Sequence, residues 1–131
     1  MDDRRESENV RIVAIVDDDA AIRAALSRLI RTIGYVTSAY ASGEELLSLI
    51  DDLQPACVLT DIQMPSMNGF ELADKLRGWR QDLPIAIMTA YPSLANRALA
   101  LAAGVREYMT KPLDDKHLEA WLAREIGLPP S

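Results

Sequence analysis

The 131-residue sequence has few of the residues that disulfides, zinc sites and hydrolytic triads require. Its one cysteine, Cys57, has no second thiol for an intramolecular disulfide or a cysteine-based metal site, which favours a reducing cytoplasm. Its one histidine, His117, excludes a histidine cluster around a metal and leaves a Ser-His-Asp triad dependent on a single residue. Disulfide-rich scaffolds, structural zinc domains and triad hydrolases are therefore disfavoured.

Long apolar runs are also missing. No stretch approaches the ~20 apolar residues of a membrane-spanning helix, and residues 1–9 lack the apolar segment of a signal peptide. The formal net charge of -6 disfavours binding to nucleic-acid backbones and to anionic membrane surfaces. We therefore expect no direct nucleic-acid partner, no membrane contact and a cytoplasmic location.

The composition is that of an ordinary globular chain, with 49% hydrophobic and 26% charged residues. The length fits one domain, which we place at residues 10–127. Residues 1–9 are predicted to be a polar N-terminal tail. Residues 128–131 follow a glycine and contain two prolines, so they are predicted to be a C-terminal tail or the start of a linker.

Short buried runs alternate with helical periodicity along this domain. The run Ile12–Val16 has no polar side, which predicts a strand covered on both faces. Five strands are predicted, at residues 12–16, 35–40, 56–60, 84–88 and 106–109, each followed by a helix with one apolar face. A capping box at residues 42–45 opens the second helix. This alternation predicts a single doubly wound (βα)5 domain of the α/β class, with a parallel five-stranded sheet between helical layers.

Polar residues follow four of these strands. They are Asp17-Asp18-Asp19, Asp61, Thr89-Ala90 and Thr110-Lys111-Pro112. The carboxyl ends of parallel strands meet at one edge, where open α/β sheets bind ligands. Carboxylates gathered there repel one another unless a cation lies among them, and oxygen ligands without nearby histidine or cysteine favour Mg²⁺. Asp19 is interpreted as a helix cap rather than a metal ligand.

The sequence lacks the glycine-rich loops of dinucleotide-binding domains and P-loop proteins after its first strand. What remains is a carboxylate nucleophile, a metal site, a hydroxyl and an ammonium group. These are the groups needed to form and stabilise an aspartyl phosphate.

Four segments at the predicted strand ends carry these groups. They are Val16-Asp17-Asp18-Asp19, Thr60-Asp61-Ile62-Gln63-Met64-Pro65-Ser66-Met67-Asn68-Gly69, Met88-Thr89-Ala90 and Tyr108-Met109-Thr110-Lys111-Pro112. They resemble, in order, the signature segments of the receiver domain of bacterial two-component response regulators, over residues 11–126. The resemblance implies a flavodoxin-like fold with strand order 2-1-3-4-5.

The resemblance also implies roles for individual residues. Asp61 is expected to be the phosphoacceptor, and Lys111 is expected to contact the phosphoryl group. A Mg²⁺ ion is expected to bind Asp17, Asp18, Asp61 and the backbone carbonyl of Gln63.

Thr89 and Tyr108 are expected to form a switch in which the hydroxyl moves to the phosphoryl oxygen and the ring changes rotamer with it. The alternative for Tyr108 is an ordinary core tyrosine. Ala90, Tyr91 and Pro112 are expected to flank the site, with a cis peptide bond before Pro112. We expect Tyr91 to shield the phosphate from water, and the alternative is that its ring points outward to bind a partner.

The function implied is a phosphorelay switch rather than an enzyme. A histidine kinase or phosphotransfer protein would phosphorylate Asp61, and the surface of the fourth helix, fifth strand and fifth helix would change to control an output partner or domain. The fourth helix, predicted at residues 94–103, has Arg97 as its only charge, so a homodimer contact there would be apolar. The alternative is a tightly packed, alanine-rich helix.

Two other functional classes remain open. One is a Mg²⁺-dependent phosphatase of the haloacid-dehalogenase type, whose D-x-D motif Asp17 and Asp19 would supply, although the chain has no room for a cap domain. The other is a receiver-like docking domain that never takes phosphate. The sequence does not name the kinase, the output or the oligomeric state, and the chain is either a stand-alone regulator or a fragment of a longer one.

Overall fold

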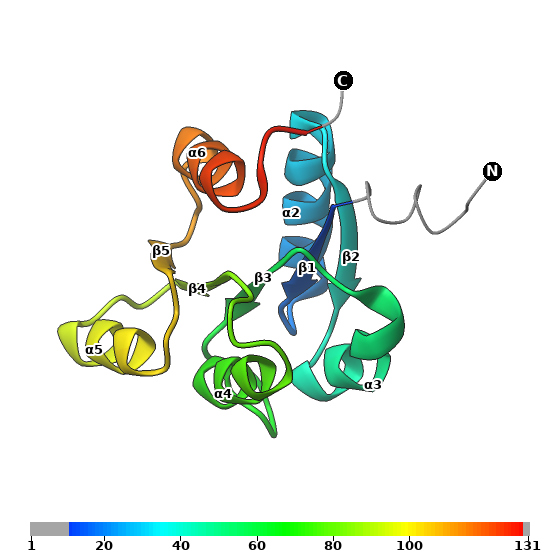
Figure 1. Cartoon of the computed structure of the whole chain (residues 1–131). Coiled ribbons are helices and arrows are strands. Elements are labelled where there is room, and N and C mark those ends of the chain that lie inside the picture. Colours follow the sequence, from blue (N-terminus) through cyan, green and yellow to red (C-terminus); the bar gives the residue numbers. More distant parts are fainter. Residues whose placement is uncertain (1–10, 130–131) are drawn as a thin grey trace.

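The computed structural model describes residues 11–129, and in it five parallel strands form one sheet in the order β2-β1-β3-β4-β5 (Figure 1). The strands are β1 (Ile12–Val16), β2 (Val36–Tyr40), β3 (Cys57–Asp61), β4 (Ile85–Thr89) and β5 (Glu107–Thr110). The helices are α2 (Ala20–Ile33), α3 (Gly43–Leu53), α4 (Gly69–Trp79), α5 (Leu94–Ala102) and α6 (Asp115–Ile126). The predicted fold class and strand order are confirmed. The predicted tail at residues 1–9 and the last two residues, Pro130 and Ser131, lie outside the described residues.

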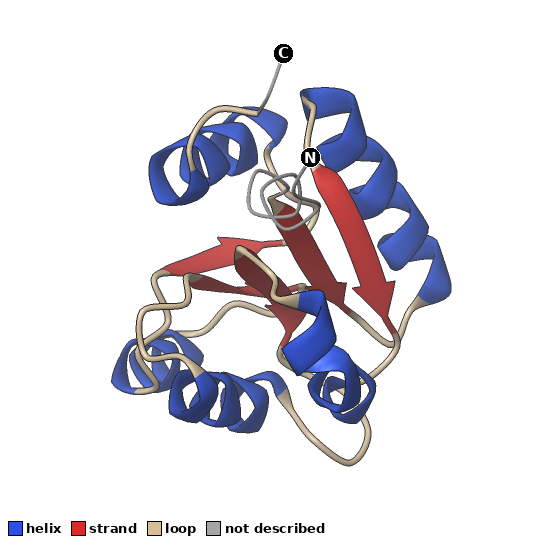
Figure 2. Cartoon of the chain, turned by 45° about the vertical axis from the view of Figure 1, so that its right-hand side comes forward, coloured by secondary structure: helices blue, strands red, loops and turns tan. Residues whose placement is uncertain are grey.

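The helices form two layers, one on each face of the sheet (Figure 2). Side chains alternate along β1, so Val13 and Ile15 pack in the core beneath α2 and α6, while Ala14 and Val16 pack beneath α3, α4 and α5. All four of these residues are fully buried. The absence of a polar side on the first strand therefore reflects a strand covered twice, as predicted.

The strands β3, β4 and β5 each begin and end one residue later than the sequence predicted, whereas β1 has its predicted bounds. Asp61 is paired with Met88, and Thr89 is paired with Thr110, so the ladder continues through residues that we expected just beyond it. Parallel pairing on a neighbouring strand supplies the backbone bonds that extend each strand. Asp61, Thr89 and Thr110 therefore lie on the sheet itself, whereas Asp17 and Lys111 directly follow the ends of β1 and β5.

Only half of the capping box predicted at residues 42–45 forms. The Ser42 hydroxyl accepts the backbone N–H of Glu45 at 3.1 Å, but the described hydrogen bonds include no return bond from the Glu45 carboxylate. A complete capping box opens α4 instead, where Asn68 and Glu71 each accept the other's backbone N–H at 2.9 Å.

α5 is not the tightly packed helix that we considered as one alternative. Ala100 is its only buried residue, and the side chains of Leu94, Leu99 and Leu101 are exposed. Within residues 11–129, no helix is long and apolar enough to cross a lipid bilayer.

Candidate functional site

Three carboxylates meet at the carboxyl edge of the sheet. Asp17 follows β1, Asp61 is the last residue of β3, and these two strands are neighbours. One carboxylate oxygen from each of Asp17, Asp18 and Asp61 lies within 4.8 Å of the other two. Asp17 is fully buried, Asp61 is half-buried and Asp18 is exposed, so the cluster opens to solvent on the Asp18 side.

Lys111 joins this cluster from the end of β5. Its Nζ donates a hydrogen bond to Asp17 Oδ2 at 2.7 Å and lies 3.2 Å from Asp61 Oδ1. Burial alone lowers the pKa of the Lys111 ammonium, but the hydrogen bond to Asp17 and the charges of both carboxylates outweigh it, so the pKa is raised above its ordinary value. Lys111 therefore stays charged at neutral pH and links the two acids.

The carboxyl group of Asp61 is perturbed in the direction typical of a functional site. Burial raises its pKa, and the charge of Asp17 adds to the rise, while Lys111 and the backbone N–H of Ile62 oppose it. The Ile62 N–H donates to Asp61 Oδ1 at 2.9 Å. One carboxylate oxygen is thus oriented by the backbone of the next residue.

The aspartate loop after β1 is fixed by its own hydrogen bonds. Asp19 Oδ1 accepts the N–H groups of Ala21 and Ile22, so Asp19 caps α2 as predicted and is not a member of the acidic cluster. Sequence analysis did not single out Arg23, whose Nη1 donates to the Asp17 carbonyl at 2.7 Å. The sequence feature that could have indicated a role for Arg23 is its place in the first turn of a helix, where the helix dipole disfavours positive charge.

The loop between β3 and α4 is held close to Asp61. Gly69 N–H donates to the Ile62 carbonyl at 2.8 Å, and a Cβ on Gly69 would overlap the backbone carbonyl oxygen of Asp61. Ser66 has a φ of 74° and donates from its hydroxyl to Glu44 Oε2 at 2.6 Å, which ties the loop to α3. Gln63 is exposed at the start of this loop.

The residues predicted to form the switch lie on β4 and β5. Thr89 is buried, and its hydroxyl accepts the Tyr91 N–H at 3.0 Å. Tyr108 is half-buried, and its hydroxyl accepts the Ser93 N–H at 3.3 Å. Tyr91 is 72% exposed, which favours the outward alternative over shielding.

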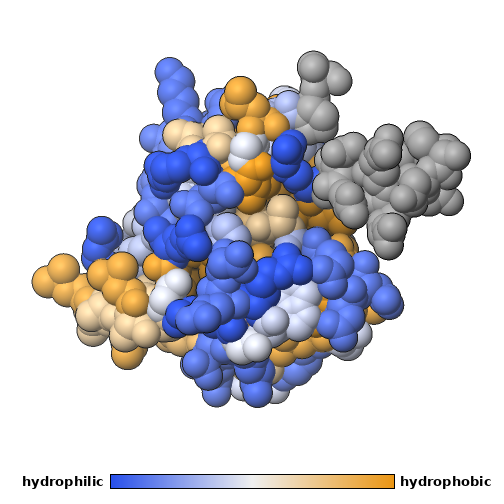
Figure 3. All heavy atoms as spheres, viewed as in Figure 1, coloured by the Kyte–Doolittle hydropathy of each residue, from blue (hydrophilic) through white to orange (hydrophobic). Residues whose placement is uncertain are grey.

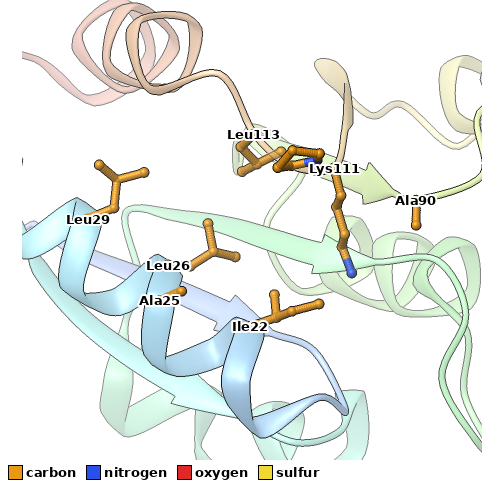
Figure 4. A pocket seen from close by; sticks show the side chains of 8 residues that line it. Ile22, Ala25, Leu26, Leu29, Ala90, Lys111 and Leu113 are labelled. Atoms are coloured by element: carbon orange, nitrogen blue, oxygen red, sulfur yellow. The ribbon is translucent and has the colours of Figure 1, made fainter.

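An apolar groove, whose lining side chains are drawn in Figure 4, shares Lys111 with the cluster. Its cavity volume is about 460 Å³. One wall is formed by α2 and the other by the segment after β5, and the lining residues are Ile22, Ala25, Leu26, Leu29, Ala90, Lys111, Pro112 and Leu113. The peptide bond between Lys111 and Pro112 is cis, as expected. Lys111 thus belongs both to the acidic cluster and to the wall of the groove.

Comparison with known proteins settles the family. The family model of the response regulator receiver domain matches residues 13–123. This chain is a response regulator receiver domain. It is 40% identical over 119 residues to "Response regulator MprA" of Mycobacterium sp. (strain KMS), covering 91% of this chain and 50% of that protein. It is 38% identical over 108 residues to "Probable transcriptional regulator ycf27" of Guillardia theta, covering 82% of this chain and 42% of that protein.

The receiver domain therefore spans about half the length of these curated relatives. Among solved structures it resembles the Vibrio cholerae chemotaxis protein CheY4, with a TM-score of 0.83, 27% identity and coverage of 89% of this chain and 99% of that chain. It also resembles a CheY-like receiver domain protein from Methanospirillum hungatei JF-1, with a TM-score of 0.82, 30% identity and coverage of 88% and 92%.

The donor set of the receiver's acidic cluster fits a hard divalent cation. Its donors are carboxylate oxygens, and neither histidine nitrogen nor cysteine sulfur belongs to it among the described residues. Mg²⁺ prefers such oxygens and typically takes one or two carboxylates while retaining water. Cys57, the only thiol, is buried in the core, where burial raises its pKa and keeps it protonated.

Proposed function

We propose that the receiver domain accepts a phosphoryl group on Asp61 from the phosphohistidine of a histidine kinase or phosphotransfer protein. The P–N bond of the phosphohistidine breaks as an Asp61 carboxylate oxygen forms a new P–O bond to phosphorus. One observation carries this proposal: Asp61 stands beside two other carboxylates and within 3.2 Å of the Lys111 ammonium, at the open edge of the sheet.

The neighbouring groups have complementary roles in this proposal. Asp17, Asp18, Asp61 and the Gln63 carbonyl would hold a Mg²⁺ ion, which when bound offsets the negative charge of the phosphoryl oxygens. The Lys111 ammonium, now paired with Asp17 and Asp61, would pair with a phosphoryl oxygen instead.

The buried Thr89 hydroxyl, at the end of β4, would donate to another phosphoryl oxygen. At present the same hydroxyl accepts the Tyr91 N–H.

The apolar groove supports a docking site for the phosphodonor. Four of its lining residues, Ile22, Ala25, Leu26 and Leu29, recur at helical spacing on α2 and so form one apolar stripe. The stripe lies opposite Pro112 and Leu113, beside the lysine that contacts Asp61. A helix with an apolar face would fill the groove and bring its phosphohistidine to Asp61.

The proposed output surface comprises α5, β5 and α6. Tyr108 joins the first two elements, because its hydroxyl bonds the Ser93 N–H just before α5 and the Arg97 guanidinium lies 6.0 Å from its ring centroid. Phosphorylation would change this surface and so control an output partner or domain. A homodimer through the exposed apolar residues of α5, a cytoplasmic location and the absence of direct nucleic-acid binding belong to the same proposal.

Phosphate incorporation tests the assignment of Asp61. The wild-type chain with acetyl phosphate and Mg²⁺ should acquire one phosphate, which treatment with base releases. Asp61→Asn should acquire none, because the amide is not nucleophilic. Asp19→Asn is the matched control, since asparagine also caps helices well and the change removes a charge from outside the acidic cluster. Equal labelling of Asp61→Asn would refute the assignment. A wild type that takes no phosphate would identify a docking domain.

The proposed docking role of the groove is tested by comparing phosphorylation by two phosphodonors. Ala25→Glu places a charge in the groove and should slow phosphotransfer from a histidine kinase that labels the wild type, by about tenfold or more. Labelling by phosphoramidate, which needs no docking surface, should stay unchanged. Ala24→Glu is the control, because Ala24 is exposed on the same helix but does not line the groove. Equal kinase rates for the wild type and Ala25→Glu would exclude the groove as the docking site.

A further inference from the structure

Arg23 makes an unusual contact with the site. It lies in the first turn of α2, and its side chain turns back so that Nη1 donates to the backbone carbonyl of Asp17 at 2.7 Å. Arg23 is half-buried, so this hydrogen bond is partly removed from competing water. The contact joins the helix that follows the aspartate loop to the residue that begins it.

The bonded carbonyl belongs to the peptide that links Asp17 to Asp18. A peptide unit is planar, so a bond to its oxygen also restrains the direction of the Asp18 N–H and the position of the Asp18 Cα. Asp17 itself is already held, because its carboxylate accepts from Lys111 and from the Asp19 N–H. Arg23 therefore restrains the peptide from which the exposed Asp18 side chain extends.

Arg23 and Lys111 donate hydrogen bonds to different kinds of oxygen. Lys111 bonds the carboxylate oxygens of Asp17 and lies against those of Asp61, which are the atoms that a metal ion would need. Arg23 bonds a carbonyl oxygen and leaves the three carboxylates available. Its geometry suits a supporting role that persists when a cation binds.

A cation at the position of Arg23 is repelled by the helix dipole unless a nearby group interacts with its charge. The first turn of a helix carries partial positive charge, and α2 has no acidic residue within its first turn to offset an arginine. The negative charge near Arg23 comes from Asp17, Asp18 and Asp19, which precede the helix. The bond to the Asp17 carbonyl gives the guanidinium a partner at that loop.

We propose that Arg23 is a positioning residue of the phosphorylation site, holding the Asp17–Asp18 peptide so that the Asp18 carboxylate is presented to a divalent cation. The proposal rests on the proposed Mg²⁺-dependent phosphorylation of Asp61. Groups that orient metal ligands typically change metal affinity by about 10- to 100-fold when removed.

The sign of the effect on Mg²⁺ binding separates positioning from simple charge. If Arg23 contributed only a positive charge, its removal would make the loop more negative and Mg²⁺ would bind more tightly. If Arg23 positions Asp18, its removal weakens Mg²⁺ binding although the loop becomes more negative. The two roles therefore predict opposite results from one titration.

The experiment is a Mg²⁺ titration of the unphosphorylated chain followed by NMR at the backbone amides of Asp18 and Asp61. Arg23→Ala should bind Mg²⁺ about tenfold more weakly than the wild type. In the metal-free protein, its Asp18 amide should also show a lower order parameter, because the peptide is released. Arg23→Lys retains the charge and a donor, and should recover part of the affinity.

Arg28→Ala is the matched control, since it removes the same charge from an exposed position of α2. It should bind Mg²⁺ as the wild type does. If Arg23→Ala does not fold, Arg23→Gln carries the same expectation, because its shorter amide does not reach the carbonyl.

Three results would overturn the proposal. Wild-type or tighter Mg²⁺ affinity in Arg23→Ala, or weaker affinity with an unchanged Asp18 order parameter, would refute the positioning role while leaving phosphorylation of Asp61 intact. A wild-type chain that binds no Mg²⁺ and takes no phosphate from acetyl phosphate would refute both proposals together.

Discussion

The helices α4 and α5 follow neighbouring strands of the site and cover the same face of the sheet, but they are packed very differently. α4 opens with the capping box of Asn68 and Glu71 and buries the residues Gly69, Leu72, Ala73 and Leu76. α5 opens with a single side-chain cap, in which Ser93 accepts the Asn96 N–H, and buries only Ala100.

The apolar residues of α5 are directed largely to solvent. Leu94 is 87% exposed, Leu99 53% and Leu101 64%. Apolar surface gathers over this helix in Figure 3, at the position that α5 occupies in Figure 1. A helix with few buried contacts opens at low free-energy cost, whereas a well-buried helix opens only with the whole domain.

The two sides of this sheet edge therefore differ in how firmly they are held. The β3–α4 side holds Asp61, the proposed phosphoacceptor, in place through Gly69, the capping box and the Ser66–Glu44 bond. The β4–α5 side is lightly held and carries the exposed apolar surface. This arrangement would suit the proposed switch, because phosphorylation at a rigid site could then shift a neighbouring helix at a low free-energy cost.

The largest expected difference between the two helices is in the free energy of unfolding. Leu72→Ala leaves a cavity at a fully buried position of α4 and should lower that free energy by about 3 kcal/mol. Leu101→Ala makes the same chemical change on α5, where the side chain is 64% exposed, and should change it by less than about 0.5 kcal/mol. Urea denaturation measures both values, and similar losses would show that α5 is packed as firmly as α4 in solution.

Hydrogen exchange sharpens the comparison without mutation. Central amides of α5 should exchange at least about tenfold faster than central amides of α4, which corresponds to about 1.4 kcal/mol less protection, because α5 opens locally. NMR-detected exchange in the unphosphorylated chain gives both rates, corrected for intrinsic exchange. Equal protection in the two helices would contradict the loosely packed helix.

A pH titration tests the bond that ties the β3–α4 loop to α3. The hydrogen bond from Ser66 lowers the pKa of Glu44, so its contribution to stability is present above the ordinary carboxyl pKa and is lost as the pH falls through the lowered value. Ser66→Ala should raise the pKa of Glu44 toward its ordinary value, as followed by NMR of the side-chain carboxyl. The corresponding carboxyl of Glu45 serves as the internal control, and an unchanged Glu44 titration would mean that the bond is absent in solution.

The smallest effect is expected at Tyr91, on the α5 side. The residue is 72% exposed, so Tyr91→Ala should leave the lifetime of the aspartyl phosphate within about twofold of the wild type, because a side chain so exposed should shield little of the site. The measurement is loss of phosphate from the labelled chain at equal Mg²⁺. Clearly faster loss in Tyr91→Ala would restore the shielding role that the sequence suggested.

Much of the candidate site was predictable because it depends on local order along the chain. The apolar run before Asp17 and the one before Asp61 predict buried strands, and parallel pairing then brings both carboxylates to one edge. Lys111 follows the last strand by the same rule. The exposure of Tyr91 was not predictable, because the residue type does not specify the rotamer that the side chain adopts.

The sequence by itself determined the alternation of strands and helices, and with it the sheet edge where the acids and the lysine meet, because hydrophobic periodicity is a local property. Tertiary structure alone decided which polar partners meet across the chain, such as Ser66 with Glu44, and how little of α5 is buried. Hydrophobic periodicity identifies the apolar face of a helix, but it does not identify the surface that packs against that face. Coverage depends on the angle and distance at which distant segments pack, and these are fixed only when the whole sheet has formed.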